Sequence, residues 1–328
     1  MIAGIGAVLL IVFWNRSEPV SERPGPSVSE VPKVQVYLDL IEEFGAAEAY
    51  EVMADEIATR DLAERHNEAH YFGAALYATE GLAGISICDD RFSHGCYHEF
   101  IGLAIAEHGL SVVEEIDRLC KARLLSCQHG IGHGLVSYYG YAFEDLHAAL
   151  DACTELGSYD PLDGCYGGIF MEYNMRTMLS VDDVPIRLAH PEGLFYECEQ
   201  VPVVTQDACY HWSAQWLLAQ FEGSLAARVQ RVEQTCAERT PEHAAQCFKG
   251  IGEELMVYTN APEESISLCE RLSGETAQYY CLASVARTLY HSHGEAVAMR
   301  ACGDLVGREQ ALCNEYATGQ SGVRVADL

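Results

Sequence analysis

The fourteen cysteines of this chain restrict its possible folds more than any other sequence feature. Taken in order they form seven neighbouring pairs, and the first members of the pairs recur every 32 to 45 residues. A period in this range is typical of a two-helix repeat. We therefore predict an all-α fold, an α-solenoid (superhelix) of about eight helical hairpins, seven of them with an internal disulfide. The pairs are Cys88 with Cys96, Cys120 with Cys127, Cys153 with Cys165, Cys198 with Cys209, Cys236 with Cys247, Cys269 with Cys281, and Cys302 with Cys313.

Helix signals occur where such a repeat requires them. Amphipathic runs at 111–120, 142–153 and 262–269 each end at the first cysteine of a pair. Between the cysteines of a pair, Thr240 and Asp160 each precede a proline, the pattern of a helix N-cap followed by proline. The first cysteine should therefore end helix A and the second should lie in the opening turns of helix B. Bridges between adjacent repeats are the alternative.

The cysteines also indicate a cellular compartment. None of them forms a C-x-x-C pair, so disulfides are favoured over zinc or redox chemistry, and disulfides persist in oxidising compartments. Residues 2–14 are uninterruptedly apolar, too few for the roughly 20 that span a bilayer but suited to a signal peptide. We expect an extracytoplasmic protein, periplasmic or at the cell surface, that is anchored to the membrane by its N-terminus or secreted. An uncleaved anchor is favoured over a cleaved signal, and a buried core helix is the alternative.

The chain divides into four expected segments. Residues 1–14 form the signal peptide or membrane anchor, 15–33 a Pro/Ser/Glu-rich linker, 34–319 the α-hairpin repeat domain and 320–328 a flexible tail. Residues 34–81 lack cysteine but keep the pattern, because His70 and Gly81 align with His98 and Gly109, so they should form a disulfide-free cap.

Charge excludes one class of partner. Twenty basic residues against 49 acidic ones give a net charge of −29, which repels a phosphate backbone, so we expect no nucleic-acid partner. A well-solvated surface explains this charge, and a groove for cations or basic peptides is the sharper alternative.

Histidines recur in phase with the cysteines. Two residues after the second cysteine of a unit, histidine fills four of eight equivalent positions, which predicts a row of imidazoles along the B helices. His129 and His133 are spaced i, i+4, as are His66 and His70, so each pair could bind one metal ion. Such a cluster would suit zinc, copper or iron(II), with Glu99 and Glu253 as further nearby carboxylates. The predicted metal ligands are His66, His70, His98, His129, His133 and Glu172.

Glycines accompany these histidines. Gly130, Gly132 and Gly134 stand within one expected helix, where together they should cost about 3 kcal/mol relative to alanine. Either close helix packing or a ligand near the backbone explains them. The HGIGH segment has the histidine spacing of H-E-x-x-H without its glutamate, so metalloprotease chemistry does not follow.

On its period and cysteine placement, the repeat domain resembles Sel1/tetratricopeptide-type α-solenoids, especially the cysteine-rich secreted ones. The C-x-H-G block from Cys127 to Gly130 resembles uncharacterised bacterial secreted proteins. This resemblance implies protein or peptide binding on a concave face. Our primary hypothesis is a membrane-tethered module that binds a protein or peptide in its concave groove, with a histidine-ligated transition metal as an added element. A metalloenzyme centred on His129 and His133 and a structural envelope scaffold are the alternatives, and we lean against an enzyme.

Overall fold

The computed structural model describes residues 31–318 except for 90, 122–125, 157–161, 163, 180–186 and 304. The described residues form helices and no β-strand, which confirms the predicted all-α repeat fold. None of the helices in these ranges is both long and apolar enough to span a membrane. The apolar segment 2–14, nearly all of the expected linker and the expected tail lie outside the described residues.

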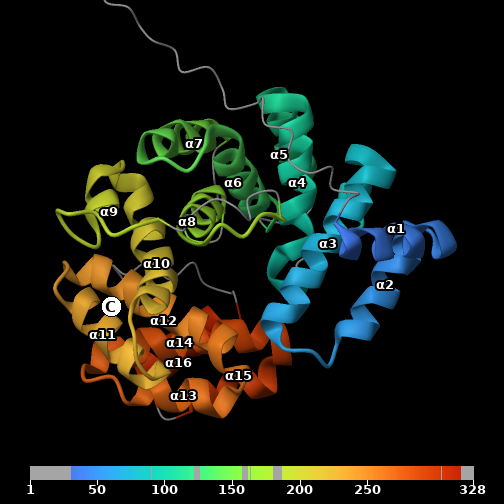
Figure 1. Cartoon of the computed structure of the whole chain (residues 1–328). Coiled ribbons are helices and arrows are strands. Elements are labelled where there is room, and N and C mark those ends of the chain that lie inside the picture. The colour runs from blue at the N-terminus through green and yellow to red at the C-terminus, as the bar shows by residue number, and fades with distance from the viewer. Residues whose placement is uncertain are drawn as a thin grey trace, which may run out of the picture.

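The helices alternate between an A and a B position, and Figure 1 follows them round the molecule. Each B helix packs against the B helices before and after it, so the B helices form one continuous row. The B helices are α3 (Leu62–Glu80), α4 (Gly95–His108), α6 (Ser126–Tyr139), α8 (Cys165–Met175), α10 (Val203–Gln220), α12 (Pro241–Thr259), α14 (Glu275–His293) and α16 (Arg308–Ala317). The A helices are α5 (Val113–Lys121), α7 (Phe143–Leu156), α9 (Tyr196–Gln200), α11 (Leu225–Ala237), α13 (Pro262–Glu270) and α15 (Glu295–Ala301). In the first disulfide unit, the 3-10 helix η2 (Gly81–Ser86) takes the place of helix A.

All seven predicted disulfides are present. Each joins the end of an A element to the opening turns of the following B helix, with Cα atoms 5.4 to 5.8 Å apart. The predicted N-cap at Thr240 is confirmed, because its side-chain oxygen accepts a hydrogen bond from the backbone N–H of His243. Asp160, the other predicted cap, lies outside the described residues.

The cysteine-free cap contains three helices rather than one hairpin. Gly45 adopts φ = 79°, a left-handed value that favours glycine, and separates α1 (Pro32–Phe44) from α2 (Ala46–Ile57). Glu68 of α3 accepts hydrogen bonds from the Lys33 ammonium group (2.9 Å) and the Tyr37 hydroxyl (2.6 Å). These bonds fix α1 on α3, the helix that carries His66 and His70.

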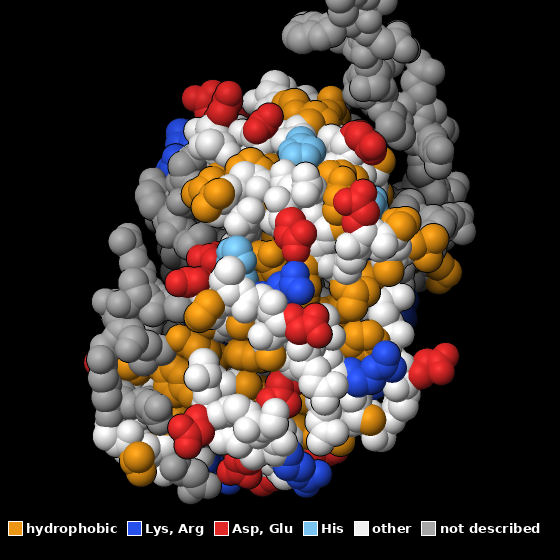
Figure 2. All heavy atoms as spheres, turned by 90° about the vertical axis from the view of Figure 1, so that its left-hand side faces the viewer, with side chains coloured by type: hydrophobic (Ala, Val, Ile, Leu, Met, Phe, Trp, Pro, Cys, Tyr) orange, Lys and Arg blue, Asp and Glu red, His pale blue; other side chains and the backbone are white. Residues whose placement is uncertain are grey.

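The row of B helices curls until α3, its first member, meets α12, its sixth. The backbone N–H of Leu62 in α3 donates a hydrogen bond (3.3 Å) to the side-chain oxygen of Asn260, which ends α12 in a left-handed conformation. The short η3 helix (Arg91–His94) likewise contacts α14. Figure 1 shows this closure as the blue N-terminal helices beside the orange and red C-terminal ones. Figure 2 shows one outer side, where acidic side chains are scattered among basic and apolar ones.

Glycines allow neighbouring B helices to approach closely. A Cβ atom at Gly130 of α6 would lie 2.9 Å from the carbonyl oxygen of Tyr97 in α4, and one at Gly132 would overlap the carbonyl oxygen of Cys165 in α8. Gly250 of α12 meets α10 in the same way. Close helix packing therefore accounts for these glycines, and it brings the side chains of adjacent B helices together.

Candidate metal centre

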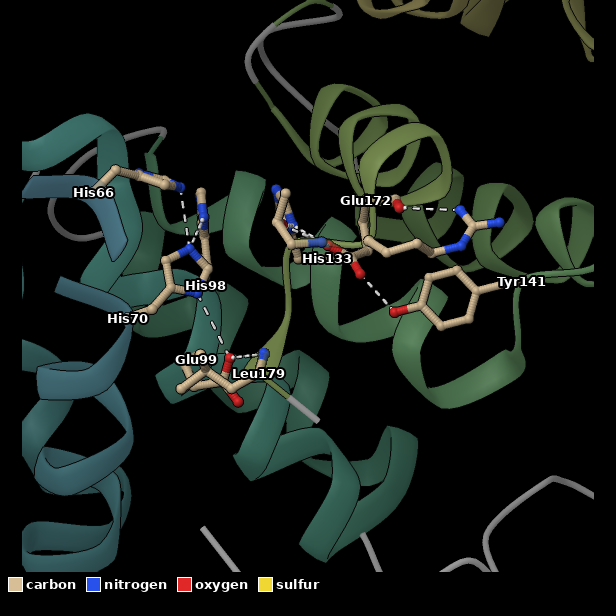
Figure 3. Close-up of polar contacts among 10 residues, drawn as sticks. His66, His70, His98, Glu99, His133, Tyr141, Glu172 and Leu179 are labelled. Carbon is tan, nitrogen blue, oxygen red and sulfur yellow. Dashed lines mark hydrogen bonds and ion pairs between the residues drawn. The ribbon is translucent and has the colours of Figure 1, made fainter. Parts of the chain in front are cut away.

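The structure brings the six predicted metal ligands to one region of consecutive B helices. Figure 3 labels all of them except His129. All except His66 are buried, and His66 is partly exposed. The ligands come from four helices, with His66 and His70 on α3, His98 on α4, His129 and His133 on α6, and Glu172 on α8.

Three of these rings face one point, and we call His66, His70 and His98 the crossed triad. The Nε2 atoms of His66 and His70 lie 3.1 Å apart, and Nδ1 of His98 lies 3.2 Å from Nε2 of His70. The three ring planes cross at 68° to 72°, so the rings are not stacked, and one nitrogen of each ring lies within 4.8 Å of one nitrogen of the other two. Tetrahedral ligands with zinc–nitrogen bonds of 2.0–2.1 Å have nitrogens about 3.3 Å apart. The crossed triad therefore fits one metal ion with little rearrangement.

Oxygen atoms on the outer side of two of these rings favour a lone pair on the inward nitrogen. Nδ1 of His66 lies 2.8 Å from the carbonyl oxygen of Phe92, which can only accept, so Nδ1 carries the ring proton and Nε2 has a lone pair. Nδ1 of His70 faces a carboxylate oxygen of Glu99 at 3.6 Å, which favours the proton on that side as well. Glu99 is itself fixed by the backbone N–H of Leu179 (2.9 Å). Carboxylates in this position orient metal-binding histidines.

A second group shares one ring with the first, and we call His98, His129 and His133 the stacked triad. Nδ1 of His133 donates to Glu172 at 3.0 Å, which places the lone pair of His133 on Nε2. The His98 and His133 rings are stacked at 4.0 Å with only 17° between their planes. Their lone pairs therefore lie in nearly parallel planes, and one ring must turn before both bind the same ion.

Glu172 acts as a support for His133. Its carboxylate accepts hydrogen bonds from the Tyr141 hydroxyl (2.5 Å) and from the hydroxyl (2.6 Å) and backbone N–H (2.9 Å) of Thr177. Burial opposes the charge, but the bonds from His133, Thr177 and Tyr141 hold the pKa of Glu172 at about 2. Its oxygens are thus occupied, so Glu172 orients His133 and does not face the crossed triad.

Two buried nitrogen atoms of the stacked triad have no hydrogen-bond partner among the described residues. They are Nε2 of His98 and Nε2 of His133. Leaving a buried polar atom unpaired costs about 1–3 kcal/mol, so native proteins rarely keep two side by side. A metal ion would satisfy such lone pairs, and the residues present fit one.

The row of imidazoles continues beyond these triads, but its next histidine contacts a carboxylate instead of other histidines. His211 of α10 contacts the carboxylate of Glu253 at 2.7 Å, and the adjacent Trp212 packs its ring 5.5 Å from that of His129. Sequence reasoning missed His94, whose ring lies 6.2 Å from that of His129. His94 reaches this region because η3 has left-handed backbone angles, which no residue pattern indicates.

These groups could hold a transition-metal ion in a buried setting of imidazoles with carboxylates behind them. Comparison of the chain with protein-family models, curated proteins and solved structures finds no match. The resemblance to cysteine-rich α-solenoids therefore stays a prediction.

Proposed function

We propose that this protein binds a transition-metal ion through His66, His70 and His98 in an extracytoplasmic compartment. One observation carries the proposal: Nε2 of His70 lies 3.1 Å from Nε2 of His66 and 3.2 Å from Nδ1 of His98, close to the spacing of nitrogens around a tetrahedral metal ion. The seven disulfides support an oxidising compartment. Tethering by residues 2–14 and capture of a protein or peptide inside the curve remain separate proposals from the sequence.

The donor set narrows the choice of metal. Neutral imidazoles suit zinc, copper and iron, whereas magnesium and calcium prefer oxygen ligands. All fourteen cysteines are paired, so no thiolate competes for the ion. Three protein nitrogens leave a fourth position open, an arrangement that zinc enzymes use for water or substrate. That open position supports a metalloenzyme as the second candidate, with the site moved from His129 and His133 to the crossed triad.

The partly exposed His66 supports an entry path for the ion. His70 and His98 are 2 % and 0 % exposed, whereas His66 is the crossed-triad member that reaches solvent. A metal ion would therefore bind His66 first and then the two buried rings. An enzyme substrate would have to approach from the same side.

Metal analysis of the oxidised full chain tests the proposal. Protein purified without chelator is analysed by mass spectrometry, and the metal-free form is titrated with Zn²⁺ by calorimetry. His70→Ala should weaken binding by more than the roughly 10- to 100-fold lost with a supporting partner. His108→Ala, at an exposed position at the end of α4, is the matched control and should bind like the unmodified chain. Equal affinity of the two variants, or no binding by the unmodified chain, would rule out the crossed triad as a metal site.

A further inference from the structure

His98 belongs to both triads. Its Nδ1 lies 3.2 Å from Nε2 of His70, and its ring centroid is 5.1 Å from those of His66 and His70. On the other side, its ring lies 5.2 Å from that of His129 and 4.0 Å from that of His133. The two nitrogens of one imidazole are therefore available to two separate groups of ligands.

The proton of His98 distinguishes it from the surrounding rings. His66 donates to the carbonyl oxygen of Phe92, His133 donates to Glu172, and Nδ1 of His70 faces Glu99. Within the described parts of the chain, no carbonyl or carboxylate oxygen hydrogen-bonds either nitrogen of His98, and its Nε2 has no partner at all. The structure thus places an oxygen atom 2.8 to 3.6 Å from the outer ring nitrogen of three histidines, whereas the hydrogen-bond partner of His98 is a ring nitrogen, Nε2 of His70.

We propose that His98 bridges two metal ions, binding one in the crossed triad through Nδ1 and a second with His129 and His133 through Nε2. The inference rests on the proposed function and extends it from one ion to two. A neutral imidazole has one lone pair for a metal, so binding through both nitrogens requires loss of its N–H proton to water. The resulting imidazolate carries one negative charge between the two ions.

The charges around the site suit this arrangement. Two divalent ions one imidazole ring apart repel each other strongly in a buried site. The imidazolate and the carboxylates of Glu99 and Glu172, each facing a ligand ring from outside, supply three negative charges against four positive ones. Both carboxylates are buried, so solvent screens them little.

The two ions should bind in a fixed order. The crossed triad already points three nitrogens inward, whereas the stacked triad requires His133 to turn out of its near-parallel position. Turning His133 also strains its bond to Glu172. The first ion therefore occupies the crossed triad, and the second binds more weakly.

A Cu²⁺ titration of the metal-free full chain tests the bridge by stoichiometry and electron paramagnetic resonance. The unmodified chain should bind two ions in two steps, and the second should reduce the signal below that of two independent spins, because the unpaired electrons couple through the ring. His66→Ala should lose the stronger step and His129→Ala the weaker one, each leaving one uncoupled ion. His108→Ala should behave like the unmodified chain.

His98→Gln provides the decisive variant, since glutamine is polar and uncharged but cannot join two ions through one ring. It should show no coupling, with disulfides and helical circular dichroism unchanged. Coupling that survives His98→Gln, or two ions without coupling in the unmodified chain, would overturn the bridge. One ion per unmodified chain would overturn the bridge and leave the proposed function intact, whereas no ion would overturn both.

Discussion

Burial sets the charge of the central histidines. It lowers the pKa of both His66 and His70 to about 3, and the neighbouring imidazoles lower it further. Burial and the same neighbours also hold the pKa of His98 well below its usual value. Glu172, in contrast, stays ionised because three side chains donate to it. Neutral rings backed by a charged carboxylate are the protonation states that metal binding requires.

These pKa values predict how stability depends on pH in the metal-free protein. Histidines titrate near 6.5 in the unfolded chain but near 3 in the folded one, so the unfolded state binds more protons between these values. Stability should therefore fall as pH decreases through this window, by about 2 kcal/mol for each of His66 and His70 at pH 5. Protonation of Glu172 changes the unfolding free energy only below pH 4.5, outside this window. The charged group that faces His70 from α4 is Glu99. Urea unfolding at pH 7.5 and pH 5 measures the difference, and His70→Gln should reduce it. An unfolding free energy equal at both pH values would contradict the prediction.

Glu99 should be a positioning residue for His70. Glu99→Gln removes the charge that favours a proton on Nδ1 of His70, so Nε2 would less often offer its lone pair to the metal. We expect Zn²⁺ affinity to fall roughly 10- to 100-fold, with little change in the helical signal. Glu115→Gln, on the exposed side of α5, is the control and should leave affinity unchanged. Calorimetric titration distinguishes the outcomes, and equal affinities would show that Glu99 is not needed to orient His70.

At the scale of single residues, recurrence in the sequence located the histidines but not their partners. His70, His98 and His129 each follow the cap or second-cysteine position by two residues, so their helices present them in the same direction. The oxygens that fix the ring protons come from elements without that periodicity. The carbonyl of Phe92 belongs to η3, and Glu172 reaches His133 from the next B helix. Only the packing of helices reveals such pairs.

At the scale of helices, the spacing between B helices depends on glycine. A glycine in mid-helix costs about 1 kcal/mol relative to alanine, yet several occur at the contacts between B helices. At Gly132, an added Cβ would meet the carbonyl oxygen of Cys165, the amide nitrogen of Ile169 and the backbone of Gly168. Backbone atoms cannot move aside as a flexible side chain can. The helix propensity lost at these positions is therefore offset by close backbone packing.

Gly132→Ala should destabilise the fold even though alanine is the better helix former. We expect a loss of about 1–3 kcal/mol, because the methyl group forces α6 and α8 apart. Gly274→Ala, before α14, is the matched control: its Cβ would have its nearest neighbour at 3.9 Å, so stability should change little. Chemical unfolding followed by circular dichroism measures both variants. A Gly132→Ala protein as stable as the unmodified chain would show that the B helices can separate without cost.

The helical hairpins were predictable because their signals are local. Each disulfide joins residues only 7 to 12 positions apart, so pairing within a hairpin follows from sequence order. Caps such as Thr240 act on the residues that follow them at once. The structure differs from the predicted hairpins at two places, and backbone geometry is the reason at both. Gly45 separates α1 from α2 in the cap, and a 3-10 helix replaces the first A helix. A single glycine or a tightened turn leaves no periodic trace in the sequence.

At the scale of the whole molecule, closure of the row distinguishes this fold from an open solenoid. Leu62 and Asn260 are 198 residues apart, and their hydrogen bond is one of the contacts that join α3 to α12. Repeats predict their neighbours but not the accumulated curvature, since small rotations between units add along the array. The sequence could therefore predict the hairpins. It could not predict that α3 of the cysteine-free cap would contact α12, the B helix of the fifth disulfide unit. The cysteine-free cap contacts α4 on one side and α12 on the other. Its stability should therefore be linked to that of the other helical hairpins.

Metal binding should consequently stabilise the entire helical array. Zn²⁺ at 100 times its dissociation constant adds about 2.7 kcal/mol to the folded state, which should raise the melting temperature by roughly 4–5 °C for a chain of this size. Since the crossed triad joins α3 to α4, and α3 also contacts α12, the shift should appear in the whole helical circular dichroism transition. His108→Ala should shift as much as the unmodified chain, and His66→Ala much less. A shift confined to a small early part of the transition would show that the cap unfolds independently and that closure does not couple the two ends.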